Sequence, residues 1–136
     1  MAFGHGKAAV FKLDDSGATL RDLSTYITEV SMPRDIETAE TTAFGSTAKS
    51  YITGLTDATI SMSGLFDSVA DGYLAGVLGQ STALSFNYGP LGSTAGMIKY
   101  TGTAILTSYE LSSSVGDVVT FSADLQVTGA ITRTTW

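Results

Sequence analysis

The chain has 136 residues and a formal net charge of −6, with seven Lys and Arg, thirteen Asp and Glu, and no cysteine. The length predicts a single domain over residues 1–136. The absence of cysteine excludes a disulfide scaffold, a thiolate zinc site and a cysteine nucleophile. The seven basic residues are dispersed along the sequence, whereas DNA-binding proteins gather them into clusters. Specific DNA binding is therefore not expected.

Hydroxyl-bearing residues and glycine dominate the composition, with 16 Ser, 20 Thr and 15 Gly. Charged residues make up only 15% of the chain, compared with about 25% in a typical domain, and the mean hydropathy is +0.21. Either other chains shield much of the surface, or hydroxyl groups alone solvate it. No stretch approaches the ~18 consecutive apolar residues of a membrane span, so no membrane association is expected.

Three short strands are expected in the first quarter of the chain, after a flexible N-terminal arm at residues 1–7. A turn is expected at residues 14–17, because Asp and Ser bond local amides and Gly accepts a positive φ. Pro33 ends the third strand, because it has no amide hydrogen to donate. The strands are expected at residues 8–13, 18–23 and 26–32.

The next segment, residues 36–50, is rich in Thr and Ala and shows neither helical nor strand periodicity. Connections of this length without structure of their own are uncommon in small domains and are often functional. We expect a long loop that reaches a neighbouring molecule.

One helix is expected at residues 69–78. Asp67 or Ser68 can cap its start, and Gly79 can end it. Gly72 and Gly76 each cost about 0.8–1 kcal/mol relative to Ala in a helix. Packing against a sheet must therefore hold this helix in place.

Two-residue alternation predicts strands in the remainder of the chain. The clearest alternation is at residues 117–129, where apolar side chains occupy odd positions from Val119 to Val127. A similar pattern occurs at residues 57–67, and two more strands are expected at residues 83–88 and 97–111. These patterns predict a mainly β domain.

The sequence contains no recognisable catalytic constellation. Gly4, Gly6 and Lys7 lack the spacing of a phosphate-binding loop, and His5, the single histidine, lies in a glycine-flanked arm without a nucleophile beside it. Asp14 and Asp15 lack the later ligands of a calcium loop. No enzymatic activity, no metal site and no cofactor are therefore expected.

Several short motifs follow one another in a recognisable order along the whole chain. They lie at residues 1–7, 11–15, 20–23, 41–45, 49–51, 54–58, 88–92 and 125–133. This succession resembles the major tail tube proteins (major tail proteins) of long-tailed bacteriophages and related phage-derived particles. The resemblance rests on the order and spacing of the motifs, because each motif alone is undistinctive.

The resemblance implies a small β-barrel or two-sheet sandwich with one flanking α-helix. It implies a structural subunit that assembles into stacked hexameric rings, forming a hollow tube through which DNA passes without specific binding. The implied partners are further copies of the chain and the tape-measure, tail-terminator and baseplate or distal-tail proteins. The implied location is the virion tail, assembled in the bacterial host cytoplasm.

Within this family the termini and a long loop contact neighbouring subunits. The candidate interface residues are therefore Phe3, His5, Lys7, Thr41, Thr42, Phe44, Gly45 and Lys49. The polar strand faces supply candidate lumen-lining residues, of which Asp124 is the strongest: Thr59, Ser61, Ser63, Thr120, Ser122, Asp124 and Gln126. An ordinary solvated outer face explains the same polar pattern equally well.

The main alternative is a carbohydrate- or receptor-binding β-sandwich module of a virion. Such a module needs an exposed aromatic platform, whereas most aromatic residues here fall at apolar strand positions. A small hydrolase is a third hypothesis, which needs a nucleophile–base pair that the single histidine is poorly placed to supply.

Overall fold

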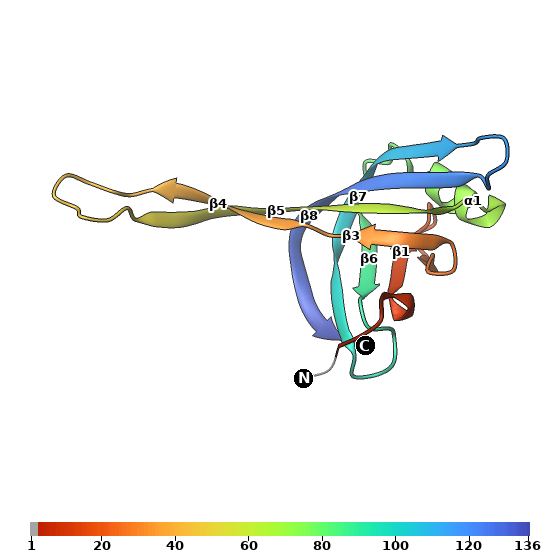
Figure 1. Cartoon of the computed structure of the whole chain (residues 1–136), viewed down its shortest axis with the longest axis horizontal. Helices are drawn as coiled ribbons and strands as arrows, with labels where there is room; N and C mark the ends of the chain where they lie inside the picture. Colours follow the sequence, from red (N-terminus) through yellow and green to blue (C-terminus); the bar gives the residue numbers. More distant parts are fainter. Residues whose placement is uncertain (1–2) are drawn as a thin grey trace.

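The computed structural model describes residues 3–136, which form one curled β-sheet, one α-helix and a long projecting hairpin (Figure 1). A 3-10 turn at Gly6–Ala8 precedes the first strand. The elements are β1 (Val10–Asp14), β2 (Leu20–Asp22), β3 (Ile27–Ser31), β4 (Arg34–Glu40), β5 (Tyr51–Leu65), α1 (Ser68–Val77), β6 (Leu84–Gly89), β7 (Ile98–Ser112) and β8 (Thr120–Thr135). The predicted arm lies partly outside the described residues, since residues 1 and 2 are not among them.

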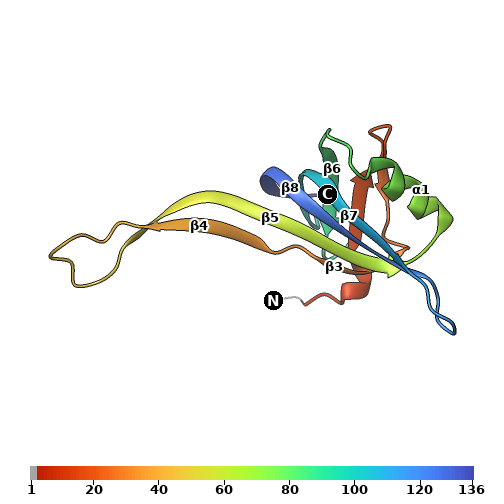
Figure 2. The same ribbon diagram turned by 90° about the horizontal axis from the view of Figure 1, so that it is seen from above.

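The strands form one antiparallel sheet in the order β2-β1-β6-β7-β8-β5-β3, with β4 paired to the far half of β5. The sheet curls around the core into a half-barrel, and α1 covers its inner side (Figure 2). The predicted mainly β fold with one flanking helix is confirmed. The strands form one curled sheet rather than the two separate sheets of a sandwich.

The core forms where the alternating patterns of different strands meet in register. On β8, Phe121, Ala123, Leu125 and Val127 are buried, as the alternation predicts. The register of β5 with β8 places Ile60 opposite Leu125 and Met62 opposite Ala123. Because opposite residues share a face of the sheet, the apolar sides of the two strands form one continuous surface.

The helix is fixed at its start and in its first turn. The Asp67 carboxylate accepts the Val69 N–H at 2.8 Å, so Asp67 is the N-cap. Ala70, Leu74 and Val77 are buried against the sheet. The Tyr109 hydroxyl on β7 donates to the Asp71 carboxylate at 2.8 Å, which ties the helix to the sheet.

Two glycines permit the curvature of the sheet. Gly129 has φ +84, and the β7–β8 register shifts beside it, where β8 bends away. At Gly64 any side chain would overlap the Tyr26 carbonyl, so β3 approaches β5 closely there. A Cβ at either position would oppose the observed backbone path.

The structure corrects the sequence interpretation of residues 36–50. Residues 36–40 belong to strand β4, and only residues 41–50 are outside regular strands. No strand period is visible in this segment because every residue of β4 is exposed, so folding requires no alternation of buried and solvated positions here. Strand β5 also begins earlier than predicted, at Tyr51.

Replacing Tyr109 with Phe is expected to lower the free energy of unfolding by about 1–2 kcal/mol, because it removes the hydroxyl that holds Asp71. Urea denaturation measures this as a lower midpoint with an unchanged slope. Tyr88→Phe is the matched control, since the Tyr88 hydroxyl has no hydrogen-bond partner among residues 3–136.

Burial, and then the Asp71 carboxylate, raise the pKa of Tyr109 above its usual value. Because the folded-state pKa lies above the unfolded value of about 10, the stabilisation is complete below that pH and is lost as the pH rises beyond it. An unchanged midpoint in Tyr109→Phe would contradict the assigned role.

Candidate assembly surfaces

The long hairpin is made of β4 and the first half of β5, and it extends from the body along the long axis of the molecule (Figure 1). Cross-strand pairs run from Arg34 opposite Ala58 at the base to Glu40 opposite Tyr51 near the tip. At the base, the Arg34 guanidinium lies over the Tyr100 ring of β7 at 5.4 Å. The seven residues 51–57 alone give a projection of roughly 23 Å.

The hairpin carries large apolar side chains that are at least half exposed. Leu55 is 77% exposed, and the others are Ile36, Phe44, Tyr51 and Ile52. Exposed apolar side chains gathered on one element mark a contact surface for another molecule. The two strands therefore hold this surface at a distance from the body.

The tip of the hairpin contains five of the predicted interface residues: Thr41, Thr42, Phe44, Gly45 and Lys49. The Thr41 N–H donates to the Ser50 carbonyl at 2.8 Å, and the Ser50 N–H donates to the Thr42 hydroxyl at 2.9 Å, closing the base of the tip. Phe44 is fully exposed at its end. Lys49 is the one charged residue among residues 41–50.

The other predicted interface residues, Phe3, His5 and Lys7, lie on the body and not beside the tip. The His5 Nδ1 accepts the Lys7 N–H at 3.1 Å and caps the 3-10 turn. His5 and Lys7 line a groove of about 570 Å³ between β1 and β3, where the curled sheet does not close. The structure thus separates the predicted interface residues into two groups.

The predicted lumen residues form one contiguous polar face, opposite the core. The β5–β8 register places Thr59 opposite Gln126, Ser61 opposite Asp124 and Ser63 opposite Ser122. Thr120 follows on the same face, at the end of the ladder. Sequence alternation had predicted which side each residue takes, and the register shows that the two strands present them together.

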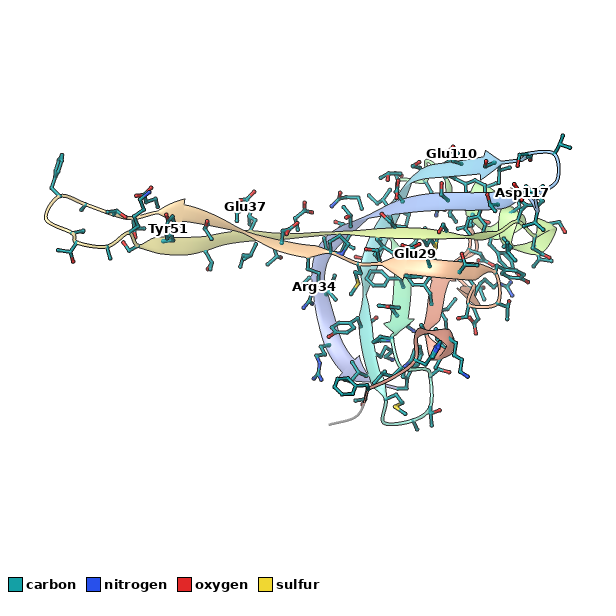
Figure 3. The ribbon with its side chains drawn as sticks, in the orientation of Figure 1. Glu29, Arg34, Glu37, Tyr51, Glu110 and Asp117 are labelled. Carbon is teal, nitrogen blue, oxygen red and sulfur yellow. The ribbon has the colours of Figure 1, made fainter. Side chains whose placement is uncertain are left out.

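This polar face extends onto the strands on either side and gains two acidic residues that the sequence analysis missed. Glu29 of β3 lies opposite Ser63, and Glu110 of β7 lies opposite Ser122 (Figure 3). No Lys or Arg occurs in β3, in β5, at residues 103–112 of β7 or at residues 120–128 of β8. The face therefore carries hydroxyls and carboxylates without compensating cations.

The acidic character continues onto the base of the hairpin. Asp35 of β4 lies directly opposite Asp57 of β5, and the Gln126 Nε2 donates to the Asp57 carboxylate at 2.7 Å. Like charges placed directly opposite each other on adjacent strands are destabilising. This pair therefore opposes the folding of the hairpin.

A second apolar surface lies at the end of the body opposite the hairpin. It consists of side chains that are between 37% and 65% exposed: Leu65, Phe66, Val69, Leu111, Val118 and Val119. We call these six residues the rim cluster. The sequence analysis missed them because strand alternation assigned Phe66 and Val119 to the core side of their strands. The adjacent pair Val118 and Val119, beside Asp117 in a turn, was the available signal.

Asp15 holds the turn that follows β1. It is one of the two adjacent carboxylates considered above as a calcium loop. Its carboxylate accepts the N–H groups of Gly17 and Thr19 and the Nε–H of Arg21, the last at 2.8 Å. The hydrogen bond from Arg21 holds the pKa of Asp15 below its usual range. This carboxylate therefore stabilises the turn between β1 and β2.

Among residues 3–136, no group of three or more His, Cys, Asp or Glu side chains is arranged to hold a metal ion. In the same part of the chain, no helix has the length and apolar character needed to cross a membrane.

The chain is thus a curled β half-barrel with exposed apolar surfaces at both ends and a polar face of hydroxyls and carboxylates. The sequence profile described as phage tail tube protein matches residues 4–133. The chain therefore belongs to the phage tail tube protein family, and it is a structural tail tube subunit. No match was found among curated protein sequences.

Solved tail structures share the fold. The subunit of a gene transfer agent (GTA) tail, determined with C6 symmetry, superposes with a TM-score of 0.79 at 18% identity over 97% of this chain and 99% of that chain. The SPP1 tail tube gives 0.74 at 14% identity, covering 98% and 80% of the two chains. A chain of the PVC sheath–tube complex, an extracellular contractile injection system, gives 0.71 at 11%, covering 98% and 93%.

Replacing Asp35 with Asn is expected to stabilise the hairpin by about 0.2–1 kcal/mol, because it removes the like charge opposite Asp57. Hydrogen exchange measures this as slower exchange of the β4 and β5 amides. Glu40→Asn, a change of the same type opposite an uncharged residue, is the control. Faster exchange in Asp35→Asn would show that the carboxylate stabilises the hairpin instead.

Proposed function

We propose that this subunit assembles into hexameric rings that stack into a hollow tube in the virion tail, and that DNA passes through the tube. Family membership supports the tube, and the fold shared with a C6-symmetric tail supports the six-fold ring. The role is structural and requires no catalysis. Assembly takes place in the host cytoplasm, where the tape-measure, tail-terminator and baseplate or distal-tail proteins are the further partners.

The observation that carries this proposal is the in-register polar face of β3, β5, β8 and β7. Lys and Arg side chains on a channel wall would bind phosphates and slow a moving DNA molecule. A wall of hydroxyls with scattered carboxylates such as Asp124 and Glu29 repels the duplex weakly and evenly. This face therefore has the chemistry of a channel lining, with Thr59, Ser61, Ser63, Thr120, Ser122, Asp124 and Gln126 facing the DNA.

The hairpin tip and the N-terminal arm supply the contacts between subunits. Phe44 and Lys49 lie at the end of a projection that reaches well beyond the body, so the tip meets a copy in the next ring. His5 and Lys7 line the open groove between β1 and β3, where a lateral neighbour can cover them, and the exposed Phe3 precedes them in the arm. Burial of these surfaces also accounts for the low charge of the chain.

The alternative, a carbohydrate- or receptor-binding module, lacks support from the arrangement of the aromatic residues. The exposed large aromatics are Phe3, Phe44, Tyr51 and Phe66, and they are spread over the arm, the hairpin and the rim cluster. They do not form one platform.

Deleting residues 41–45 is expected to leave a folded protein that does not polymerise into tubes, because this segment contributes no residue to the core. Negative-stain microscopy of the intact protein at high concentration should show rings or open-ended tubes. Circular dichroism checks that the deleted variant is folded. Unchanged tube yield after the deletion would reject the assigned role of the tip, and persistent monomers of the intact chain would reject the tube itself.

Single cysteines can be labelled selectively, because the chain contains none of its own. A bulky maleimide label on Ser61→Cys or Asp124→Cys is expected to appear inside the channel in cryo-electron microscopy of assembled tubes. The same label on Ser81→Cys, an exposed position after α1, is expected on the outside. Label density outside the tube for Ser61→Cys would contradict the assigned lining.

A further inference from the structure

The molecule has two exposed apolar ends that differ from each other. One is the hairpin tip, where Phe44 is fully exposed, and the other is the rim cluster on the body. Figure 1 shows the hairpin at one end of the long axis and α1 with the β7–β8 turn at the other. A contact between unlike ends of identical chains repeats along an axis and so builds a stack.

The rim cluster is held together by three elements. The Phe66 N–H donates to the Val119 carbonyl at 2.9 Å, which joins the end of β5 to the β7–β8 turn. Leu111 of β7 lies opposite Phe121 of β8. It follows Tyr109 of β7 by two residues, and the Tyr109 hydroxyl donates to the Asp71 carboxylate of α1. Val69 is the second residue of the same helix. Leu65 lies opposite Thr120 at the end of the polar face, whereas Leu111 lies opposite the core residue Phe121, so the cluster spans the end of the sheet across both of its faces.

The charges of the two ends are complementary. The segments that form the rim cluster, residues 65–71 and 110–119, contain Asp67, Asp71, Glu110 and Asp117 and no Lys or Arg. Within the tip, residues 41–50, Lys49 is the one charged residue, and Glu40 lies one residue before the tip on β4. Asp117 is exposed in the β7–β8 turn, where its carboxylate accepts the Ser114 hydroxyl at 3.2 Å (Figure 3).

We propose that the rim cluster of one subunit receives the hairpin tip of a second copy in the adjacent ring, with Phe44 packing on the apolar rim and Lys49 pairing with Asp117. This inference rests on the proposed tube and names the surface that receives the hairpin. An apolar anchor surrounded by a complementary charge gives both affinity and a fixed orientation.

The groove between β1 and β3 is the competing receiver for the tip, but its charges fit less well. It is lined by Lys7 and Glu29 together, so it offers Lys49 both repulsion and attraction. It also lies along the side of the body, where a neighbour in the same ring covers it. The rim cluster lies at the end, where a neighbour in the next ring arrives.

Cysteine cross-linking tests the contact directly. The double variant Ser46→Cys with Val118→Cys, oxidised after tube assembly, is expected to give a ladder of multimers on a denaturing gel, because every copy then bears one tip and one rim cysteine. A mixture of the two single variants is expected to stop at dimers. The control pair Ser46→Cys with Ser81→Cys, whose second position lies past the other end of α1, is expected to give no ladder.

Tubes that form normally but yield no ladder in the Ser46→Cys, Val118→Cys variant would overturn the proposal while leaving the tube intact. Dimers from the Ser46→Cys variant alone would also overturn it, since tips would then meet tips. Failure of the unmodified chain to form rings at all would instead remove the proposed function. The two failures are thus distinguishable.

A charge exchange tests the assigned pair. Lys49→Glu and Asp117→Lys, each alone, are expected to reduce the fraction of protein in tubes by about tenfold, with single rings remaining. The double variant is expected to recover most of that loss, because the pair is restored with reversed sign. Ser81→Glu, which adds the same negative charge elsewhere, is the control. Equal defects in the single and double variants would overturn the Lys49–Asp117 pairing.

Discussion

The antiparallel pairing of β5 with β8 is the interaction on which the rest of the structure depends. A single register places Ile60 against Leu125 in the core and Ser61 against Asp124 on the polar face. A slip by one residue would exchange the two faces along the whole strand. The same 15-residue strand continues into the hairpin, so the core, the polar face and the projecting tip share one backbone.

The close approach of β3 to Gly64 and the bend at Gly129 explain how a flat ladder becomes a half-barrel. The first lets a short strand add to the free edge of β5, and the second turns the end of β8 out of the plane. The curl brings α1 over the apolar side, where Asp71 meets the Tyr109 hydroxyl. The polar side is left uncovered over four adjacent strands.

Local sequence signals were sufficient to predict an element where its own residues show which side is buried or where it begins. The alternation from Val119 to Val127 predicted both faces of β8, and Asp67 predicted the start of α1. The hairpin could not be predicted in this way. Both of its strands are exposed there, including Ile36 and Ile52, so their residues show no alternation of buried and exposed positions. Glu29 and Glu110 joined the polar face only through register, which is a long-range property. The rim cluster was missed because Phe66 and Val119 continue core patterns past the point where the core ends.

The unlike ends of the long axis have a consequence for the length of any assembly. A ring added to a stack covers one rim surface and presents another identical one, so addition never removes the site for the next addition. A head-to-tail contact is the same at every step, so it does not depend on how many copies are already joined. The contact between copies can specify the direction of a tube, but it sets no limit on the length.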